Sequence, residues 1–236
     1  MASTRLPGKV MLPAAGLPLL QHLIERVRRC RRVDAVVVAT TVRPEDAVIA
    51  GLCERIGCPV HRGPVDDITE RLLGAARGQE AGALVQLTGD NPLVDPVHID
   101  ATVDLFRSGA WDYAGNNLTA SFPIGFDVRM VSVAALERSA ALSNDPTDRV
   151  HGTYHIHRHP DLFPRTGWEA PEDLRWPGLR LTVDEPADYE LVRRIIETLH
   201  PQNPAFTAAD VVTLLRARPD WVALNGGVRQ KQAEEG

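Results

Sequence analysis

Apolar runs alternate with segments of helical periodicity along the first half of the chain. Residues 35–40 and 83–87 are short and almost continuously apolar, a pattern typical of strands that are covered on both faces of a parallel sheet. Apolar side chains recur at helical spacing in residues 19–27, 46–56, 68–78 and 98–106. This alternation predicts an α/β fold with a mostly parallel sheet flanked by helices.

The pattern changes character in the middle of the chain. Residues 113–133 hold short strand-like pieces interrupted by Pro123 and Gly125. Beyond it, helices are predicted over about 134–142, 148–157, 188–199 and 207–216, and a strand over 179–183. Because no internal repeat or low-complexity linker is visible, we expect one domain over residues 1–227 and a polar tail over 228–236.

Composition narrows the functional classes. The chain has 236 residues, and its net charge of −5 gives no reason to expect nucleic acid, which favours a basic surface. No apolar stretch reaches the ~20 residues of a membrane span, so no membrane partner is expected. Three cysteines at irregular spacing do not suit a disulfide framework or a zinc site. No apolar signal-peptide region follows Met1, which makes the cytoplasm the expected compartment.

Candidate chemistry is expected at the carboxyl ends of the strands, where ligands bind in open parallel sheets. The N-terminal segment offers a hydroxyl at Ser3, a guanidinium at Arg5, an ammonium at Lys9 and, at Gly8, close backbone approach. Such a loop can hold a triphosphate, because N–H groups and the hydroxyl bind oxygens while the two cations neutralise charge. A basic loop near a terminus is also often just a solvated surface feature.

Two carboxylates follow apolar strands. Asp90 comes after the strand predicted over 83–87, and Asp184 comes after the one over 179–183. Either suits Mg²⁺, which usually takes one or two protein carboxylates and completes its shell with phosphate and water oxygens. Asp184 can equally cap the helix that follows it, and Asp95 is more simply interpreted as a helix-start residue.

Four segments, read together, resemble those of a known family. They are STRLPGK at residues 3–9, TGDNPLVDP at 88–96, PIGFDV at 123–128 and LTVDEPAD at 181–188. In this order they resemble the CMP-sugar synthetases, which activate sialic acids, 3-deoxy-manno-octulosonate and relatives, and most closely the spore-coat polysaccharide branch. The resemblance implies a Rossmann-like nucleotidyltransferase fold. It also implies a Mg²⁺-dependent transfer of CMP from CTP to an acidic sugar of the 2-keto-3-deoxy type, with release of pyrophosphate, for surface polysaccharide.

The same resemblance implies roles for individual residues. The residues that match the nucleotide site are Ser3, Arg5, Gly8, Lys9, Thr88 and Gly89. The residues that match the metal ligands are Asp90 and Asp184, which form the catalytic set together with Arg5 and Lys9. The residues that match the sugar-facing side are Gly125, Asp127 and His151. Such a transfer depends on positioning and charge neutralisation, which agrees with the absence of any convincing nucleophilic triad in the sequence.

The resemblance is incomplete at its N-terminal side. Family members begin with an apolar strand that runs into Gln-Ala-Arg before the Ser-x-Arg loop, whereas Met1 already lies inside that signature. The first strand, which is central in the family's sheet, is therefore expected to be missing, leaving two strands without partners. Either Met1 is an internal methionine of a longer protein, or the chain is truncated. A truncated chain could be a non-catalytic nucleotide-binding or regulatory module.

Three further expectations follow from the resemblance. Relatives commonly pair through the middle insertion, here residues 111–160, which implies a homodimer. Nothing in the sequence reads the base directly, so UTP and GTP stay open as alternatives to CTP. Gln86 stands where relatives often carry arginine, and Arg129 stands where an acidic residue is common, so the identity of the sugar stays open.

Overall fold

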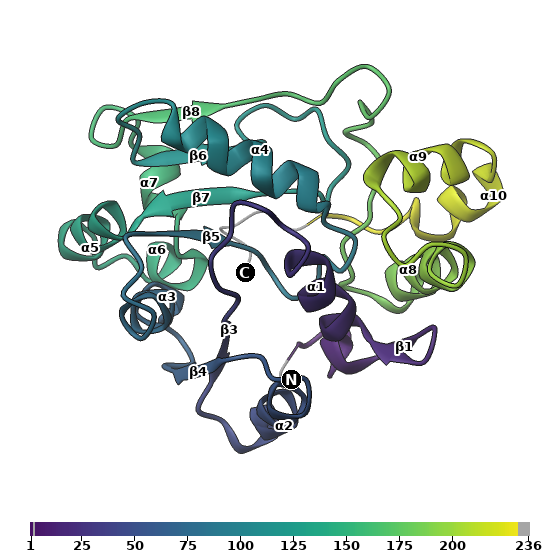
Figure 1. The fold of residues 1–236 in the computed structure, drawn as a ribbon, viewed down its shortest axis with the longest axis horizontal. Coiled ribbons are helices and arrows are strands. Elements are labelled where there is room, and N and C mark those ends of the chain that lie inside the picture. The colour runs from purple at the N-terminus through teal and green to yellow at the C-terminus, as the bar shows by residue number, and fades with distance from the viewer. Residues whose placement is uncertain (2, 231–236) are drawn as a thin grey trace.

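The protein is a layered α/β structure in which strands lie between helices (Figure 1). The structure is a computed structural model and describes residues 1 and 3–230. The strands are β1 (Pro13–Ala14), β2 (Leu17–Pro18), β3 (Val38–Thr41), β4 (Val60–Gly63), β5 (Ala83–Gln86), β6 (Tyr113–Gly115), β7 (Arg129–Ser132) and β8 (Arg165–Gly167). The α-helices are α1 (Leu19–Val27), α2 (Ala47–Arg55), α3 (Ile68–Arg77), α4 (Pro96–Arg107), α5 (Val133–Leu142), α6 (Pro146–His151), α7 (Tyr154–Arg158), α8 (Pro186–Leu199), α9 (Ala208–Arg216) and α10 (Pro219–Val222). The 3-10 helices are η1 (Lys9–Met11), η2 (Pro44–Asp46) and η3 (Ala223–Asn225).

The larger sheet has the strand order β5-β7-β6-β8. β7 pairs antiparallel with β5 and with β6, while β6 and β8 pair in parallel. Three of its four strands therefore run in one direction, and β7 alone is reversed. β3 and β4 form a separate parallel pair, and β1 and β2 form a small antiparallel hairpin. The predicted α/β class is confirmed, and the reversed strand comes from the region where an insertion was predicted.

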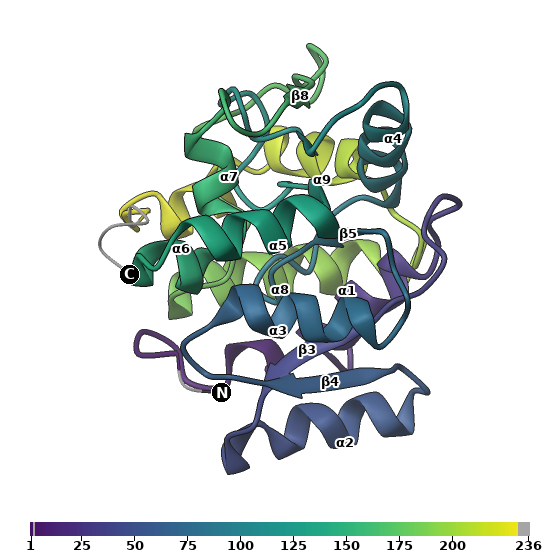
Figure 2. The same ribbon diagram turned by 90° about the vertical axis from the view of Figure 1, so that its left-hand side faces the viewer.

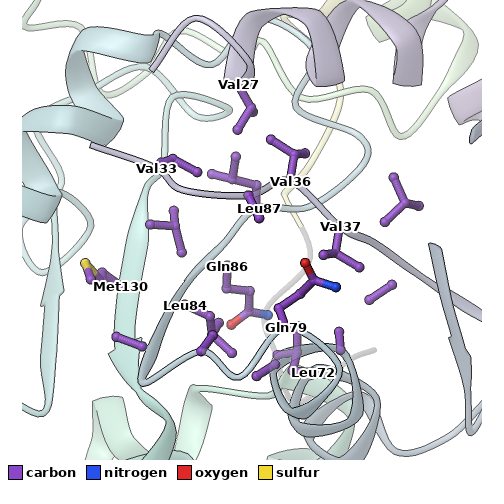
Figure 3. A pocket seen from close by; sticks show the side chains of 18 of the residues that line it. Val27, Val33, Val36, Val37, Leu72, Gln79, Leu84, Gln86, Leu87 and Met130 are labelled. Carbon is purple, nitrogen blue, oxygen red and sulfur yellow. The ribbon is translucent and has the colours of Figure 1, made fainter. Parts of the chain in front are cut away.

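The sheet is interrupted between β3 and β5. Among the described residues, no backbone hydrogen bond joins these two strands, and a cavity of about 980 Å³ lies between them. We call this cavity the interstrand channel. Figure 3 shows its lining, which is mainly aliphatic and includes Val36 near β3, Leu87 after β5 and Val27 at the end of α1. The larger sheet and the β3-β4 pair are therefore not joined into one continuous sheet among the described residues.

The strand predicted over residues 179–183 is an extended segment with a single bridge, between Ile124 and Arg180. Its backbone nevertheless pairs closely with the loop before β7. The Leu181 N–H donates to the Ile124 carbonyl at 2.7 Å, and the Ile124 N–H donates to the Leu179 carbonyl at 2.9 Å. Leu179 and Leu181 are buried in the apolar cluster under α8 and α9, so the predicted burial holds although the regular ladder does not.

The helix predicted over residues 148–157 is broken into α6 and α7. The break lies at Gly152, which has φ of +65°, a conformation that glycine adopts without strain. In the view of Figure 2, α5, α6 and α3 lie in front of the strands and cover this face of the larger sheet.

The other predicted helices form, and several carry the cap that their sequence indicates. The Asp95 carboxylate accepts a hydrogen bond from the Val97 N–H at 2.8 Å, which confirms Asp95 as a helix-start residue. Thr207 caps α9, since its hydroxyl accepts a bond from the Asp210 N–H at 3.2 Å. These local signals fix where the helices begin.

Candidate active site

The N-terminal loop, residues 3–9, is a compact turn. The Ser3 hydroxyl accepts a hydrogen bond from the Leu6 N–H at 3.3 Å, and the Lys9 N–H donates to the Leu6 carbonyl at 3.2 Å. Gly8 adopts φ of +71°, in the left-handed region, directly before η1 begins at Lys9. The loop is therefore shaped by its own hydrogen bonds, and its glycine turns the chain so that Lys9 points toward the sheet.

Lys9 joins the two predicted metal carboxylates. Its Nζ lies 2.8 Å from Asp90 Oδ2 and 2.8 Å from Asp184 Oδ1. The guanidinium of Arg5 lies 3.0 Å from the same oxygen of Asp184. Burial lowers the pKa of Lys9, but the two carboxylates outweigh it and raise that pKa above its usual value. The structure thus brings Asp90 and Asp184 together beside the N-terminal loop.

The backbone explains why two carboxylates so distant in sequence meet. The Val183 N–H donates to the Asp90 carbonyl at 2.9 Å, which holds the two acidic positions side by side. Val183 and Leu181 are fully buried, so the segment that carries Asp184 is anchored in the core below it. The site is thus placed by packing and by main-chain bonds as well as by attraction between charges.

Arg180 is part of the site, although the sequence analysis did not single it out. Its Nη2 lies 2.6 Å from Asp184 Oδ2, and its Nε lies 2.9 Å from Asp188 Oδ1. The other Asp188 oxygen accepts the Asp184 N–H at 2.9 Å. Burial raises the pKa of Asp184, but Lys9, Arg180 and Arg5 outweigh it and hold that pKa below its usual value. Both oxygens of Asp184 are therefore engaged with cations.

The two carboxylates fit a Mg²⁺ ion that is shared with phosphates. Mg²⁺ is commonly held by one or two carboxylates plus substrate phosphates, and an all-protein cage is unusual for it. Within the described residues, no group of three or more His, Cys, Asp or Glu side chains is placed to hold a metal. The ammonium of Lys9 already sits between the oxygens of Asp90 and Asp184, which shows that this position favours positive charge.

The predicted sugar-facing loop packs directly against the segment that carries Asp184. Gly125 has φ of +108°, and a Cβ added there would lie 2.7 Å from the Thr182 nitrogen. Asp127 follows on the same loop. Burial raises the pKa of Asp127, Arg129 opposes that rise, and the charge of Asp90 adds to it. Asp127 is therefore close enough to Asp90 for their charges to interact.

Thr88 and Gly89 line the approach to Asp90. The Thr88 hydroxyl accepts a hydrogen bond from the Asn91 side-chain amide at 3.0 Å. A Cβ added at Gly89 would lie 3.2 Å from Val10, so the N-terminal segment crosses close above this glycine. The two predicted nucleotide-site segments are thus in contact.

His151 lies farther from the carboxylates, at the end of α6. Its ring packs edge-on against Tyr154, with centroids 5.8 Å apart. The next two residues reach the end of β5, since the Thr153 hydroxyl lies 3.0 Å from Gln86 Oε1. In the described part of the chain, the cations within ion-pair distance of Asp184 belong to Arg5, Lys9 and Arg180.

Comparisons with known proteins agree with this geometry. A family model described as Cytidylyltransferase matches residues 1–210. The chain is 32% identical to the spore coat polysaccharide biosynthesis protein SpsF of Bacillus subtilis, over 93% of this chain and 92% of that protein. It is 36% identical to a 3-deoxy-manno-octulosonate cytidylyltransferase of Anaeromyxobacter dehalogenans, over 46% of this chain and 44% of that protein.

A solved structure supports the same assignment. A cytidylyltransferase from Leptospira borgpetersenii superposes with a TM-score of 0.89 at 26% identity, covering 98% of this chain and 95% of that one. No helix among the described residues has the length and apolar character needed to cross a membrane. The family match over most of the chain, the relatives and the superposition all lead to one statement: this protein belongs to the cytidylyltransferase family.

Proposed function

We propose that the chain transfers CMP from CTP to an acidic sugar of the 2-keto-3-deoxy class and releases pyrophosphate. The observation that carries this proposal is the position of Lys9 between Asp90 and Asp184, with Nζ 2.8 Å from an oxygen of each. This cluster lies at the carboxyl end of β5, where parallel sheets bind ligands. The similarity to SpsF supports a product used in surface polysaccharide, and the similarity to the 3-deoxy-manno-octulosonate cytidylyltransferase supports an acidic acceptor.

In the proposed reaction, a sugar hydroxyl oxygen forms a bond to the α-phosphorus of CTP. The bond between that phosphorus and the bridging oxygen breaks, pyrophosphate leaves, and the hydroxyl proton is released to water. Arg5 and Lys9 bind and neutralise the phosphates, while the backbone at Gly8 and Gly89 and the hydroxyls of Ser3 and Thr88 approach the nucleotide. Asp90 and Asp184 would hold a Mg²⁺ ion, which would supply further charge neutralisation at the phosphates.

The acceptor is proposed to enter from the side of the loop that carries Gly125 and Asp127, with His151 beyond it. This loop contacts the Asp184 segment through its backbone, so an acceptor bound there lies beside the reacting phosphate. Catalysis in this arrangement comes from holding the hydroxyl and the phosphorus in line, which does not require a nucleophilic side chain.

The decisive experiment measures pyrophosphate release with CTP, Mg²⁺ and a panel of 2-keto-3-deoxy acids. We expect Asp90→Asn to lower the rate about 100-fold or more, because a carboxylate that holds the metal is lost. Asp173→Asn, at an exposed position, is the matched control and should keep full activity. UTP and GTP in place of CTP test the base. No release by the wild-type chain with any acid of the panel would reject the proposal.

The interstrand channel favours a second candidate, a nucleotide-binding or regulatory module without turnover. A sheet interrupted beside β5 leaves one edge of that strand unpaired, and Asp90 lies in the turn that follows β5. Calorimetry with CTP on this chain, and on a chain extended by the in-frame codons upstream of Met1, distinguishes the two. Binding by both forms, with turnover by neither, would favour the module.

The proposed homodimer uses the region around residues 111–160. Exposed aliphatic side chains gather there and just beyond it, with Leu142 57% and Leu162 47% exposed. Light scattering after size exclusion gives the test. A dimer that becomes monomeric in Leu142→Glu and stays dimeric in the control Val97→Glu, on α4, would support this surface.

A further inference from the structure

Arg129 lies at the end of the larger sheet where β5 leads into the candidate active site. It is the first residue of β7 and pairs in register with Gln86, the last residue of β5. β5 continues directly toward Asp90, so Arg129 and Asp90 belong to the same end of the sheet. Residues directly opposite each other in an antiparallel pair project to the same face, so Arg129 and Gln86 are neighbours on one face.

The guanidinium of Arg129 lacks a partner within the part of the chain that the structure describes. The residue is half-buried, its Nε is fully buried, and neither a hydrogen bond nor an ion pair reaches it. Arg165, which is also half-buried, donates instead to the carbonyl of His157. A guanidinium that is partly removed from water without a hydrogen-bond partner is costly, because the protein does not replace the hydrogen bonds that water made to its buried Nε. A bound anion would remove that cost.

The surroundings of Arg129 are short of negative charge. The charge of Arg129 acts on Tyr113, His157 and Asp127, and Arg165 acts on the first two of these as well. Asp127 is the acidic group of this set, and it does not come within ion-pair distance of Arg129 among the described residues. An additional carboxylate placed near Arg129 would therefore be electrostatically favourable.

Two predicted sugar-facing residues, Asp127 and His151, belong to segments near Arg129. Asp127 precedes it by two positions, and the turn after His151 reaches its register partner, since the Thr153 hydroxyl lies 3.0 Å from Gln86 Oε1. That contact engages the oxygen of the Gln86 amide. The phosphate-binding cations, by contrast, gather around Asp184 and do not touch Arg129. This placement assigns Arg129 to the acceptor and not to the triphosphate.

We propose that Arg129 binds the carboxylate of the acceptor sugar and so selects anionic acceptors over neutral ones. This inference rests on the proposed function and adds the residue that recognises the acid. The planar guanidinium can donate two parallel N–H bonds to a carboxylate, and a dry site strengthens them. The amide N–H₂ of Gln86, on the same face, is a further donor for an acceptor oxygen.

The test is calorimetric binding of 3-deoxy-manno-octulosonate and of N-acetylneuraminate, each compared with its uncharged methyl ester, in the presence of CMP. We expect the wild-type chain to bind at least one acid more tightly than its ester. Arg129→Gln should weaken the acid about 30-fold or more and leave the ester unchanged. Arg129→Lys should bind the acid with an affinity between those of the wild-type chain and Arg129→Gln, because lysine keeps the positive charge but cannot donate two parallel N–H bonds. Arg107→Gln, at an exposed position on α4, is the control.

Separate titrations with CTP distinguish failure of this inference from failure of the proposed function. CTP affinity within about twofold of wild type in Arg129→Gln supports the assignment to the acceptor. An equal loss for CTP and acid overturns it, as does equal binding of acid and ester by the wild-type chain, or binding of neither acid. If the wild-type chain does not bind CTP, the proposed function fails at its donor. Unfolding midpoints of all variants check that they are folded.

Discussion

At the scale of single residues, the site is a balanced set of charges. Arg5, Lys9, Asp90 and Asp184 could be predicted, because each occupies a recognisable segment and the strand-end rule brings those segments together. Arg180 could not, since a residue four positions before Asp184 on an extended segment is not expected to touch it. The chain turns at Asp184 into α8, and this turn makes the contact.

This charge balance predicts how stability depends on pH. Asp184 has a pKa below its usual value in the folded chain, so its contribution is present above about pH 4 and is lost as pH falls further. Lys9 has a raised pKa, so its contribution is present at neutral pH and is lost as pH rises beyond about 10.4.

Lys9→Gln should therefore flatten both limbs of a plot of the free energy of unfolding against pH. Urea titrations between about pH 3 and pH 11 provide the measurement. Arg218→Gln, at an exposed ion pair, is the control and should leave both limbs in place. If the free energy of unfolding of Lys9→Gln falls at low and high pH as much as that of the wild-type chain, other groups cause the pH dependence.

Arg180 should matter for stability independently of any substrate. Replacing it with Gln leaves Asp188, which is 0% exposed, without its cation, and we expect a loss of about 3–5 kcal/mol in the free energy of unfolding. Arg175→Gln removes an exposed pair with Glu169 and should cost less than about 1 kcal/mol. Chemical denaturation of both variants compares the two costs directly.

At the scale of elements, sequence patterns place helices better than they place strand pairings. Caps such as Asp95 and Thr207 are local, so the sequence contains the whole signal for where α4 and α9 begin. The reversed direction of β7 and the single bridge at Arg180 depend on which distant segments meet, and no local pattern encodes that. The break at Gly152 was visible only as one glycine within a periodic run.

The close approach of the sugar-facing loop to the Asp184 segment gives an element-scale prediction. Gly125→Ala should destabilise the protein by about 2 kcal/mol or more, because alanine is strained at φ of +108° and its Cβ would clash with backbone at 2.7 Å. Gly178→Ala is the matched control, since a Cβ there meets nothing within 4 Å. Equal urea midpoints for the two variants would contradict the observed packing.

At the scale of the whole molecule, the interstrand channel divides the sheet. Three apolar clusters hold the parts together, and α1 spans the division because Leu20, Leu23 and Ile24 pack in the cluster that includes α2 and residues beside β5. The sequence comparison that places Met1 inside the family's signature led us to expect such an interruption. Its consequence, two strands that are each paired on one side only, could be seen only once β3 and β5 were placed.

This arrangement predicts uneven hydrogen exchange within the sheet. Amides of β3 and β5 that do not bond to β4 or β7 should exchange much faster than those of β6, which is paired on both sides. Exchange measured by mass spectrometry after pepsin digestion can resolve these segments. Uniform protection across β3, β5 and β6 would mean that the channel is closed in solution.

The channel has one more consequence, for handling the protein. Its two strand edges present unpaired N–H and C=O groups beside aliphatic side chains, the combination that recruits a strand from a neighbouring molecule. Self-association should grow with concentration and with warming, and light scattering would detect it before activity falls. Dilute, cool solutions would then preserve the native fold, whereas concentrated stocks would gel or precipitate along those edges.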